Sequence, residues 1–139
     1  MSSGIYNCFK QDCMTKRVDL SGDTIMVALM SDSHVFSAAH NYWSDVSANE
    51  IDPSGFVGYI QGGNTLSGLT VYGTTTAKWN ATDISWNNST IIAYHAVIYD
   101  ATASGALICS IDFGGGKSTE AEDFKIRWDN AVNAIITLT

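Results

Sequence analysis

Apolar and polar residues alternate with a period of two along most of the chain. Residues 82–86, 107–113 and 124–128 each place apolar side chains on one side and mainly polar or charged side chains on the other. This spacing is typical of strands that are buried on one face. In this phase the indoles of Trp86 and Trp128 fall on the apolar sides, so both are expected to face the core.

Two segments are apolar on both faces, namely residues 23–30 (DTIMVALM) and 91–100 (IIAYHAVIYD). Strands of this kind lie inside a sandwich or beneath an interface. Residues 66–73 and 134–139 add two further candidate strands. With glycine-containing turns about every ten residues, the pattern predicts an all-β fold. The expected architecture is an antiparallel β-sandwich or jelly roll of about seven to eight short strands.

Helical spacing occurs once, near the N-terminus. Ser3 is a suitable N-cap for a short helix over residues 4–15, in which Ile5, Phe9 and Cys13 mark the apolar side. After it, residues 32–63 fit no regular pattern and are expected to form a long irregular excursion that carries contacts.

The length of 139 residues is sufficient for one domain and for its own hydrophobic core. We therefore expect a single β-sandwich over residues 1–139, with residues 1–17 as an N-terminal helix or arm. The first residues have no basic segment followed by an apolar run, so no secretory signal is expected. No apolar run approaches the roughly 18 residues that cross a bilayer, so no membrane association is expected.

The charge distribution argues against nucleic acid as a partner. The net charge is -7, and residues 18–116 contain nine acidic residues but a single base, Lys78. The only local basic pairs are Lys16 with Arg17 and Lys125 with Arg127. Binding to phosphates needs clustered lysine and arginine, and two such pairs are too few for a nucleic-acid groove.

The sequence contains no recognisable catalytic or nucleotide-binding motif, so neither enzyme activity nor a cofactor is expected. The cysteines Cys8, Cys13 and Cys109 lack zinc-ligand spacing and are expected to be reduced structural residues. His34 and His40 lack a third ligand and are interpreted as loop and surface histidines, so no metal site is expected.

Three further features have a simple structural interpretation. Residues 114–116 (GGG) are expected to form a hairpin loop, because the segment that follows alternates and is not helical. The acidic residues at 120, 122 and 123 lack calcium-loop spacing and are expected to lie in a solvated loop. Trp43 and Trp79 are not placed by the pattern, and exposed indoles would offer a platform for sugar rings.

The order of the segments resembles a family of small structural proteins encoded among the virion genes of tailed bacteriophages. The resemblance runs nearly end to end, and no single piece of it is diagnostic. The matching segments are Phe9-Lys10, VDL (18–20), DTIMVAL (23–29), VFSAAHNYWSDV (35–46), NEI (49–51), GF.G (55–58), GGNTLSGLTV (62–71), A..ISW (81–86), AYHAVIYD (93–100), LICSIDFGGG (107–116) and FKIRWDNAVNAIITL (124–138). Relatives often have a glycine before the last strand, where this chain must bend at Ala131 or Asn133.

The resemblance implies a β-sandwich virion protein. Within that class we expect a capsid decoration or cement protein, which binds the outer lattice of the major capsid protein. An acidic exterior avoids packaged DNA, and strands that are apolar on both faces suit a homo-oligomer, a dimer or trimer on capsid symmetry axes. The expected location is the capsid exterior, after assembly in the host cytoplasm. The alternative is a tail, neck or fibre component, which would contact host-surface sugars.

The expected capsid and self-association contacts lie in the N-terminal segment and in the irregular region from His34 to Tyr59. Both stretches are rich in aromatic residues, and the first also holds three of the seven bases. The alternative interpretation is that these aromatics cap the open end of the sandwich. The candidate contact residues are Ile5, Tyr6, Phe9, Lys10, Phe36, Tyr42, Trp43, Phe56 and Tyr59.

Overall fold

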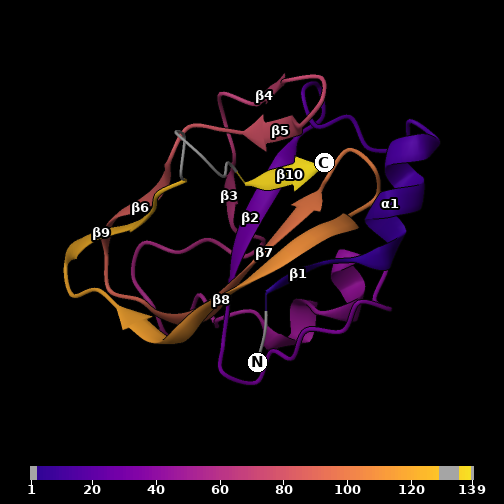
Figure 1. The fold of residues 1–139 in the computed structure, drawn as a ribbon. Helices are drawn as coiled ribbons and strands as arrows, with labels where there is room; N and C mark the ends of the chain where they lie inside the picture. The colour runs from indigo at the N-terminus through magenta and orange to yellow at the C-terminus, as the bar shows by residue number, and fades with distance from the viewer. Residues whose placement is uncertain (1–2, 129–134, 139) are drawn as a thin grey trace.

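A computed structural model describes residues 3–128 and 135–138, and its centre is an antiparallel five-stranded sheet (Figure 1). Strands make up 44% of the chain and helices 11%, which confirms the predicted all-β class. The predicted bend at Ala131 or Asn133 lies outside the described residues. In sheet order the five strands are β1 (Gly4–Ile5), β8 (Ala106–Ser118), β7 (Ile92–Asp100), β2 (Ile25–Met30) and β3 (Asn64–Thr65).

A second layer covers one face of this sheet. It consists of a three-stranded sheet and a two-stranded sheet, and Figure 1 shows β4 and β5 above the five-stranded sheet, with β10 drawn across the upper part of β2. Trp79, Trp86 and Phe124 from this layer pack with Ile25 and Ile98 of the central sheet. Trp86 and Trp128 are both in this core, as the alternation predicts. The strands are β10 (Ile136–Leu138), β5 (Ala77–Asn80), β4 (Thr70–Tyr72), β6 (Ile84–Ser89) and β9 (Glu122–Ile126).

The opposite face of the sheet is covered by the irregular excursion. Two short 3-10 turns, η1 (Trp43–Asp45) and η2 (Ser47–Asn49), lie in the purple segment below the sheet in Figure 1. Val46 is buried against this face, and the Trp43 ring stacks on Tyr99 of β7 with centroids 4.6 Å apart. The two-faced apolar strands are therefore buried within the chain itself.

Hydrogen bonds fasten the excursion to the edge of β2. The backbone N–H of Ile51 donates to Leu29 O at 3.1 Å, and that of Ser31 donates to Asn49 O at 2.8 Å. The Tyr59 hydroxyl accepts from Leu29 N at 3.0 Å and donates to Glu50 Oε2 at 2.5 Å. Burial raises the pKa of the Glu50 carboxyl, and the hydrogen bond from Tyr59 opposes that rise. These contacts cover strand edge that would otherwise be open beyond β3.

The N-terminal helix is shorter than predicted. The helix α1 spans Asn7–Met14, because Gly4–Ile5 pair with β8 as a strand instead of starting the helix. Ser3 does not cap the helix, since its hydroxyl accepts a hydrogen bond from Asp112 N at 2.8 Å. Local spacing suggested the longer helix, but pairing with a strand a hundred residues away determines the conformation of these residues.

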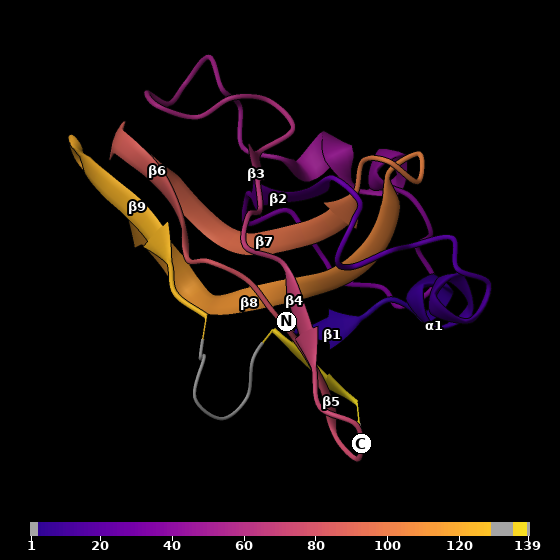
Figure 2. The ribbon, with the colours of Figure 1, turned by 90° about the horizontal axis from the view of Figure 1, so that it is seen from above.

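The glycine run is a bulge inside β8, and the predicted hairpin loop at residues 114–116 is wrong. Ala93 pairs with Lys117 and His95 with Asp112, so four residues of β8 stand opposite Tyr94 alone. Gly114 and Gly115 have φ values of +77° and +142°, which side-chain-bearing residues rarely adopt. Figure 2 shows the strong curvature of β7 and β8 that accompanies this irregularity. The chain reverses further on, in the turn between β8 and β9.

Substitution of Gly63 by Ala is expected to lower the free energy of unfolding by more than about 2 kcal/mol. Gly63 has a φ of +92°, and a Cβ there would collide with the backbone carbonyl of Val27 in β2. Gly55→Ala is the matched control, because its Cβ would meet only Asp52 O at 3.6 Å. Urea unfolding of both variants measures the difference, and equal stabilities would contradict the close approach of residue 63 to β2.

Trp128→Ala is expected to cost about 3 to 5 kcal/mol of unfolding free energy, as for other large aromatic residues removed from a core. Trp128 is 9% exposed, and its indole N–H donates to Thr82 O at 3.2 Å. Trp128→Phe retains most of the apolar volume and should lose clearly less. A cost below about 1 kcal/mol for the alanine variant would show that the indole is not packed in the core.

Candidate functional site

The structure removes three of the predicted contact residues from the surface. Tyr6, Phe9 and Tyr59 are 0%, 2% and 5% exposed, and their rings pack in the core. They are buried because β1 and α1 lie against β8 and because Tyr59 bonds to β2. In this structure the three side chains belong to the core and offer no surface to a partner, which corrects the prediction that they make surface contacts.

The two predicted contact stretches do meet in space. Asn7 N donates to Ala38 O at 2.9 Å, and the Tyr6 and Phe36 rings lie 5.0 Å apart. Beyond α1, Arg17 donates to the Tyr42 hydroxyl at 3.1 Å, with its guanidinium carbon 5.1 Å from the ring centroid. Arg17 and Tyr42 are both exposed, and we refer to them as the Arg17–Tyr42 contact.

The remaining predicted residues divide by exposure. Lys10 is exposed on α1, whereas Ile5, Phe36, Trp43 and Phe56 are half-buried. The aromatic residues of the excursion therefore mainly cover the sheet. This arrangement resembles the alternative interpretation, in which they cap the open end of the sandwich.

A buried pair of histidines lies between the excursion and the central sheet. His34 Nε2 lies 3.0 Å from Ser110 Oγ, and the His34 and His95 ring centroids are 5.0 Å apart. His95 Nε2 is 3.7 Å from Asp112 Oδ1. The interpretation of His34 as a surface residue is wrong, because it is fully buried. Burial, followed by the neighbouring His95, lowers the pKa of His34 to about 4, so its imidazole is neutral at pH 7.

A serine beside a histidine has the composition of a nucleophile and its base. Residues 34 and 110 are 76 positions apart, so no local motif reveals this contact. Ser110 is 1% exposed and His34 is 0% exposed. A nucleophile must reach its substrate, and the excursion covers both groups in this structure. The pair therefore acts as a buried polar contact that joins the excursion to β8.

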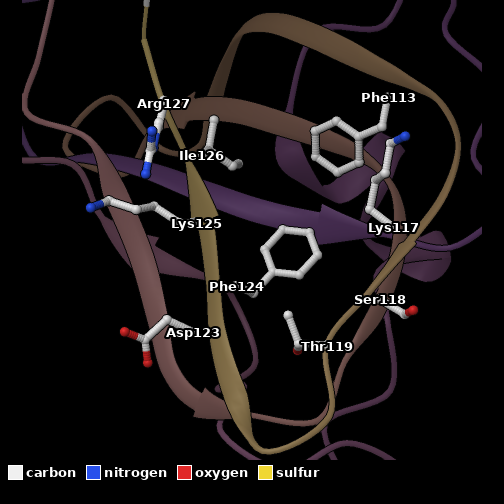
Figure 3. Close-up of a pocket in the computed structure, with 9 residues that line it drawn as sticks. All are labelled: Phe113, Lys117, Ser118, Thr119, Asp123, Phe124, Lys125, Ile126 and Arg127. Atoms are coloured by element: carbon white, nitrogen blue, oxygen red, sulfur yellow. The ribbon is translucent and has the colours of Figure 1, made fainter.

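An open cleft of about 560 Å³ lies between the C-terminal half of β8 and β9 (Figure 3). The two strands follow one another through a tight turn, yet no pairing joins them among the described residues. Within residues 3–128 and 135–138, β9 pairs only with β6, and β1 pairs with β8 only at Ser110 and Cys109. Each strand therefore presents a free edge to the space between them. We call this space the β8–β9 cleft.

The cleft combines apolar side chains with three cations. Phe113 and Phe124 lie with ring centroids 6.1 Å apart, and Figure 3 shows Phe124 pointing from β9 towards β8. Lys117, Lys125 and Arg127 also line the cleft, which gathers three of the chain's seven bases. One carboxylate, Asp123, lies among them and accepts a hydrogen bond from Asn88 N at 3.0 Å, so the lining charge is two positive units in excess. None of the three forms an ion pair with another described residue.

Of the three bases in the cleft, the sequence grouped only Lys125 with Arg127. Lys117 joins them because the turn after β8 folds β9 back beside it. The preceding GGG bulge was the available signal, since a bend in β8 changes where the following residues lie.

The other predicted features are placed as follows. Trp79 is buried and donates from its indole N–H to Leu20 O at 3.0 Å, so it offers no sugar platform. The three cysteines are unpaired, and burial raises the pKa of the Cys109 thiol to about 12. Within residues 3–128 and 135–138, no three potential metal ligands cluster together. No helix in the same ranges has the length and apolar character needed to span a membrane.

Comparisons of the chain with protein-family models, with curated proteins and with solved structures find no match. The resemblance to tailed-phage virion proteins therefore stays a prediction based on the order of the sequence segments.

The buried His34 predicts that stability falls as the pH drops from about 6.5 towards 4. The folded protein holds the pKa of His34 near 4, whereas the ordinary histidine pKa of 6.5 applies when the chain unfolds. The unfolded chain then binds the proton more readily, which costs at most about 3 kcal/mol of unfolding free energy by pH 4. Urea unfolding at several pH values should show a flatter dependence in His34→Gln than in the wild type.

Asp100 changes the unfolding free energy with pH in the opposite direction to His34, so a variant at Asp100 provides the control. Burial, followed by the nearby Asp23 carboxyl, raises the pKa of Asp100 to about 7. Its contribution to stability is full below pH 3.8 and is lost as the pH rises through about 7. Asp100→Asn should therefore steepen the loss of stability on acidification. A His34→Gln variant with an unchanged pH profile would contradict the assignment.

Proposed function

We propose that the chain is a structural protein of a tailed-phage virion, a decoration or cement protein that binds the outer lattice of the major capsid protein. The order of its segments and its all-β, sandwich-like fold support this class of protein. The proposed location is the capsid exterior, after assembly in the host cytoplasm. In this role the protein binds other proteins and carries out no chemistry of its own.

The observation that carries the proposal is the exposed Arg17–Tyr42 contact. Arginine and tyrosine are enriched at the centres of protein interfaces. The tyrosine ring buries a large area with few rotatable bonds, and the planar guanidinium of arginine donates several hydrogen bonds at once. Here each side chain already holds the other, through a hydrogen bond of 3.1 Å and a cation–π contact. This preorganisation lowers the entropy lost on binding.

The surface around this contact combines the N-terminal segment with the excursion. Asn7 N bonds to Ala38 O, and the Cys8 thiol lies 3.5 Å from Asn41 O. The excursion is held by the sheet, so Tyr42 projects from a supported segment. We propose this surface as the capsid contact, with Lys10 as a further exposed base.

The homo-oligomer is also a proposal. The two-faced strands no longer argue for it, since the excursion covers the second face. What supports it is the symmetry of a capsid lattice, on which copies around an axis gain avidity from several modest contacts. A tail, neck or fibre component is the alternative placement, and it differs in copy number. Quantitative gels of purified particles distinguish hundreds of copies from a few dozen or fewer.

Arg17→Glu and Tyr42→Ala are expected to weaken binding to undecorated capsids of the same phage by roughly tenfold or more each, as for residues at the centre of an interface. Tyr42 is exposed, so Tyr42→Ala should leave the fold intact. Arg17→Glu also removes the 3.7 Å ion pair of Arg17 with the buried Asp12, so circular dichroism must show that this variant folds before its binding is compared. Deleting residues 2–9 is a poorer test, because it removes β1 and the buried Tyr6 and Phe9.

The matched control is Lys117→Glu, a charge reversal in the β8–β9 cleft, which lies at the opposite end of the molecule from α1 (Figure 1). Cosedimentation with capsids measures all three variants. Undiminished binding of both Arg17→Glu and Tyr42→Ala would contradict the proposed contact surface.

A further inference from the structure

We propose that the β8–β9 cleft binds an extended segment of another protein, which adds as a strand to the free edge of β9 and carries alternating apolar and acidic side chains. This inference does not rest on the virion role.

The backbone of the cleft is suited to an added strand. A free strand edge presents N–H and C=O groups that pair readily with another chain, which is the basis of β-strand addition. Both walls of the cleft are such edges, since β9 pairs only with β6 and no pairing joins β8 to β9 among the described residues. The volume of about 560 Å³ is within the range of sites that hold ligands.

The glycine bulge explains why the cleft is open. Four residues of β8 stand opposite Tyr94, and a Cβ on Gly116 would lie 3.0 Å from the Tyr94 ring. A bulge of this kind bends its strand. The bend directs β8 away from β9. In a regular hairpin the two strands would instead be paired.

The side chains of β9 specify what the added strand carries. Phe124 and Ile126 alternate with Lys125 and Arg127, and Figure 3 shows Phe124 and Lys125 on opposite sides of the strand. Residues directly opposite on neighbouring strands face the same side of the sheet. One set of the partner's side chains therefore meets the half-buried Phe113 and Ile126, whereas Phe124 between them is only 6% exposed and forms the floor of the cleft. The alternate set meets the two cations.

Charge complementarity makes that alternate set acidic. The protein as a whole carries a net charge of -7, yet three of its seven bases line this cleft. Lys117, Lys125 and Arg127 have no ion-pair partner among the described residues, so their charge is available to a ligand. Apolar side chains interleaved with the cations favour a peptide over a polyphosphate, which would need a continuous basic track.

The proposal is tested with a fluorescent, N-acetylated and C-amidated peptide of alternating Glu and Val, its binding to the full chain followed by anisotropy. A Lys-Val peptide of the same length tests the charge. A Glu-Val peptide with N-methyl groups along one edge tests the backbone pairing. On the protein, Lys125→Glu reverses a charge in the cleft, and Lys10→Glu is the matched control on α1.

We expect saturable binding of the Glu-Val peptide and none of the Lys-Val peptide. N-methylation and Lys125→Glu should each weaken binding by roughly tenfold, whereas Lys10→Glu should leave it unchanged. Amide chemical-shift changes should cluster at residues 113–118 and 122–127. Three results would overturn the proposal: no saturable binding up to about 1 mM, equal binding of the N-methylated peptide, or tighter binding of a single-stranded oligothymidylate.

Discussion

The central sheet is apolar on both of its faces, and the rest of the structure follows from the need to cover each of them. Ile25, Val27 and Leu29 point one way from β2, while Ala28 and Met30 point the other, and all are fully buried. Burying a large apolar side chain stabilises the fold by about 1.5 to 3 kcal/mol, so an uncovered face would cost many such contributions. The small sheets cover one face, and residues 32–50 with the N-terminal segment cover the other.

This covering decides which residues are left for binding. The aromatic side chains that look like surface contacts in the sequence are mostly drawn into the second layer, as Tyr6 and Tyr59 show. What stays exposed lies at the margins of the covered sheet. At one end Arg17 and Tyr42 hold each other, and at the other the bulged β8 leaves an open cleft beside β9. Both proposed binding surfaces therefore consist of residues that stay exposed after the two faces of the central sheet have been covered.

The parts predicted from sequence are those that depend on local alternation. The phase of the strands correctly placed Trp86 and Trp128 in the core, and it distinguished the two-faced strands from the others. The errors concern partners that are distant in the chain. Residues 4–5 form a strand because β8 is available to pair with them, and His34 is buried because it meets Ser110. The cleft was missed for the same reason, since only the fold brings Lys117 beside β9.

Hydrogen exchange of the excursion tests most directly whether it is an integral layer of the fold. The amides of Ser31 and Ile51 bond to Asn49 O and Leu29 O, at the junction of the excursion with β2. If the excursion is an integral layer, these amides open only with the sheet, and their protection should lie within about tenfold of that of the β2–β7 amides. Exchange as fast as in the exposed turn at residues 73–75 would contradict the account. The second face of the sheet would then need a cover from outside the chain.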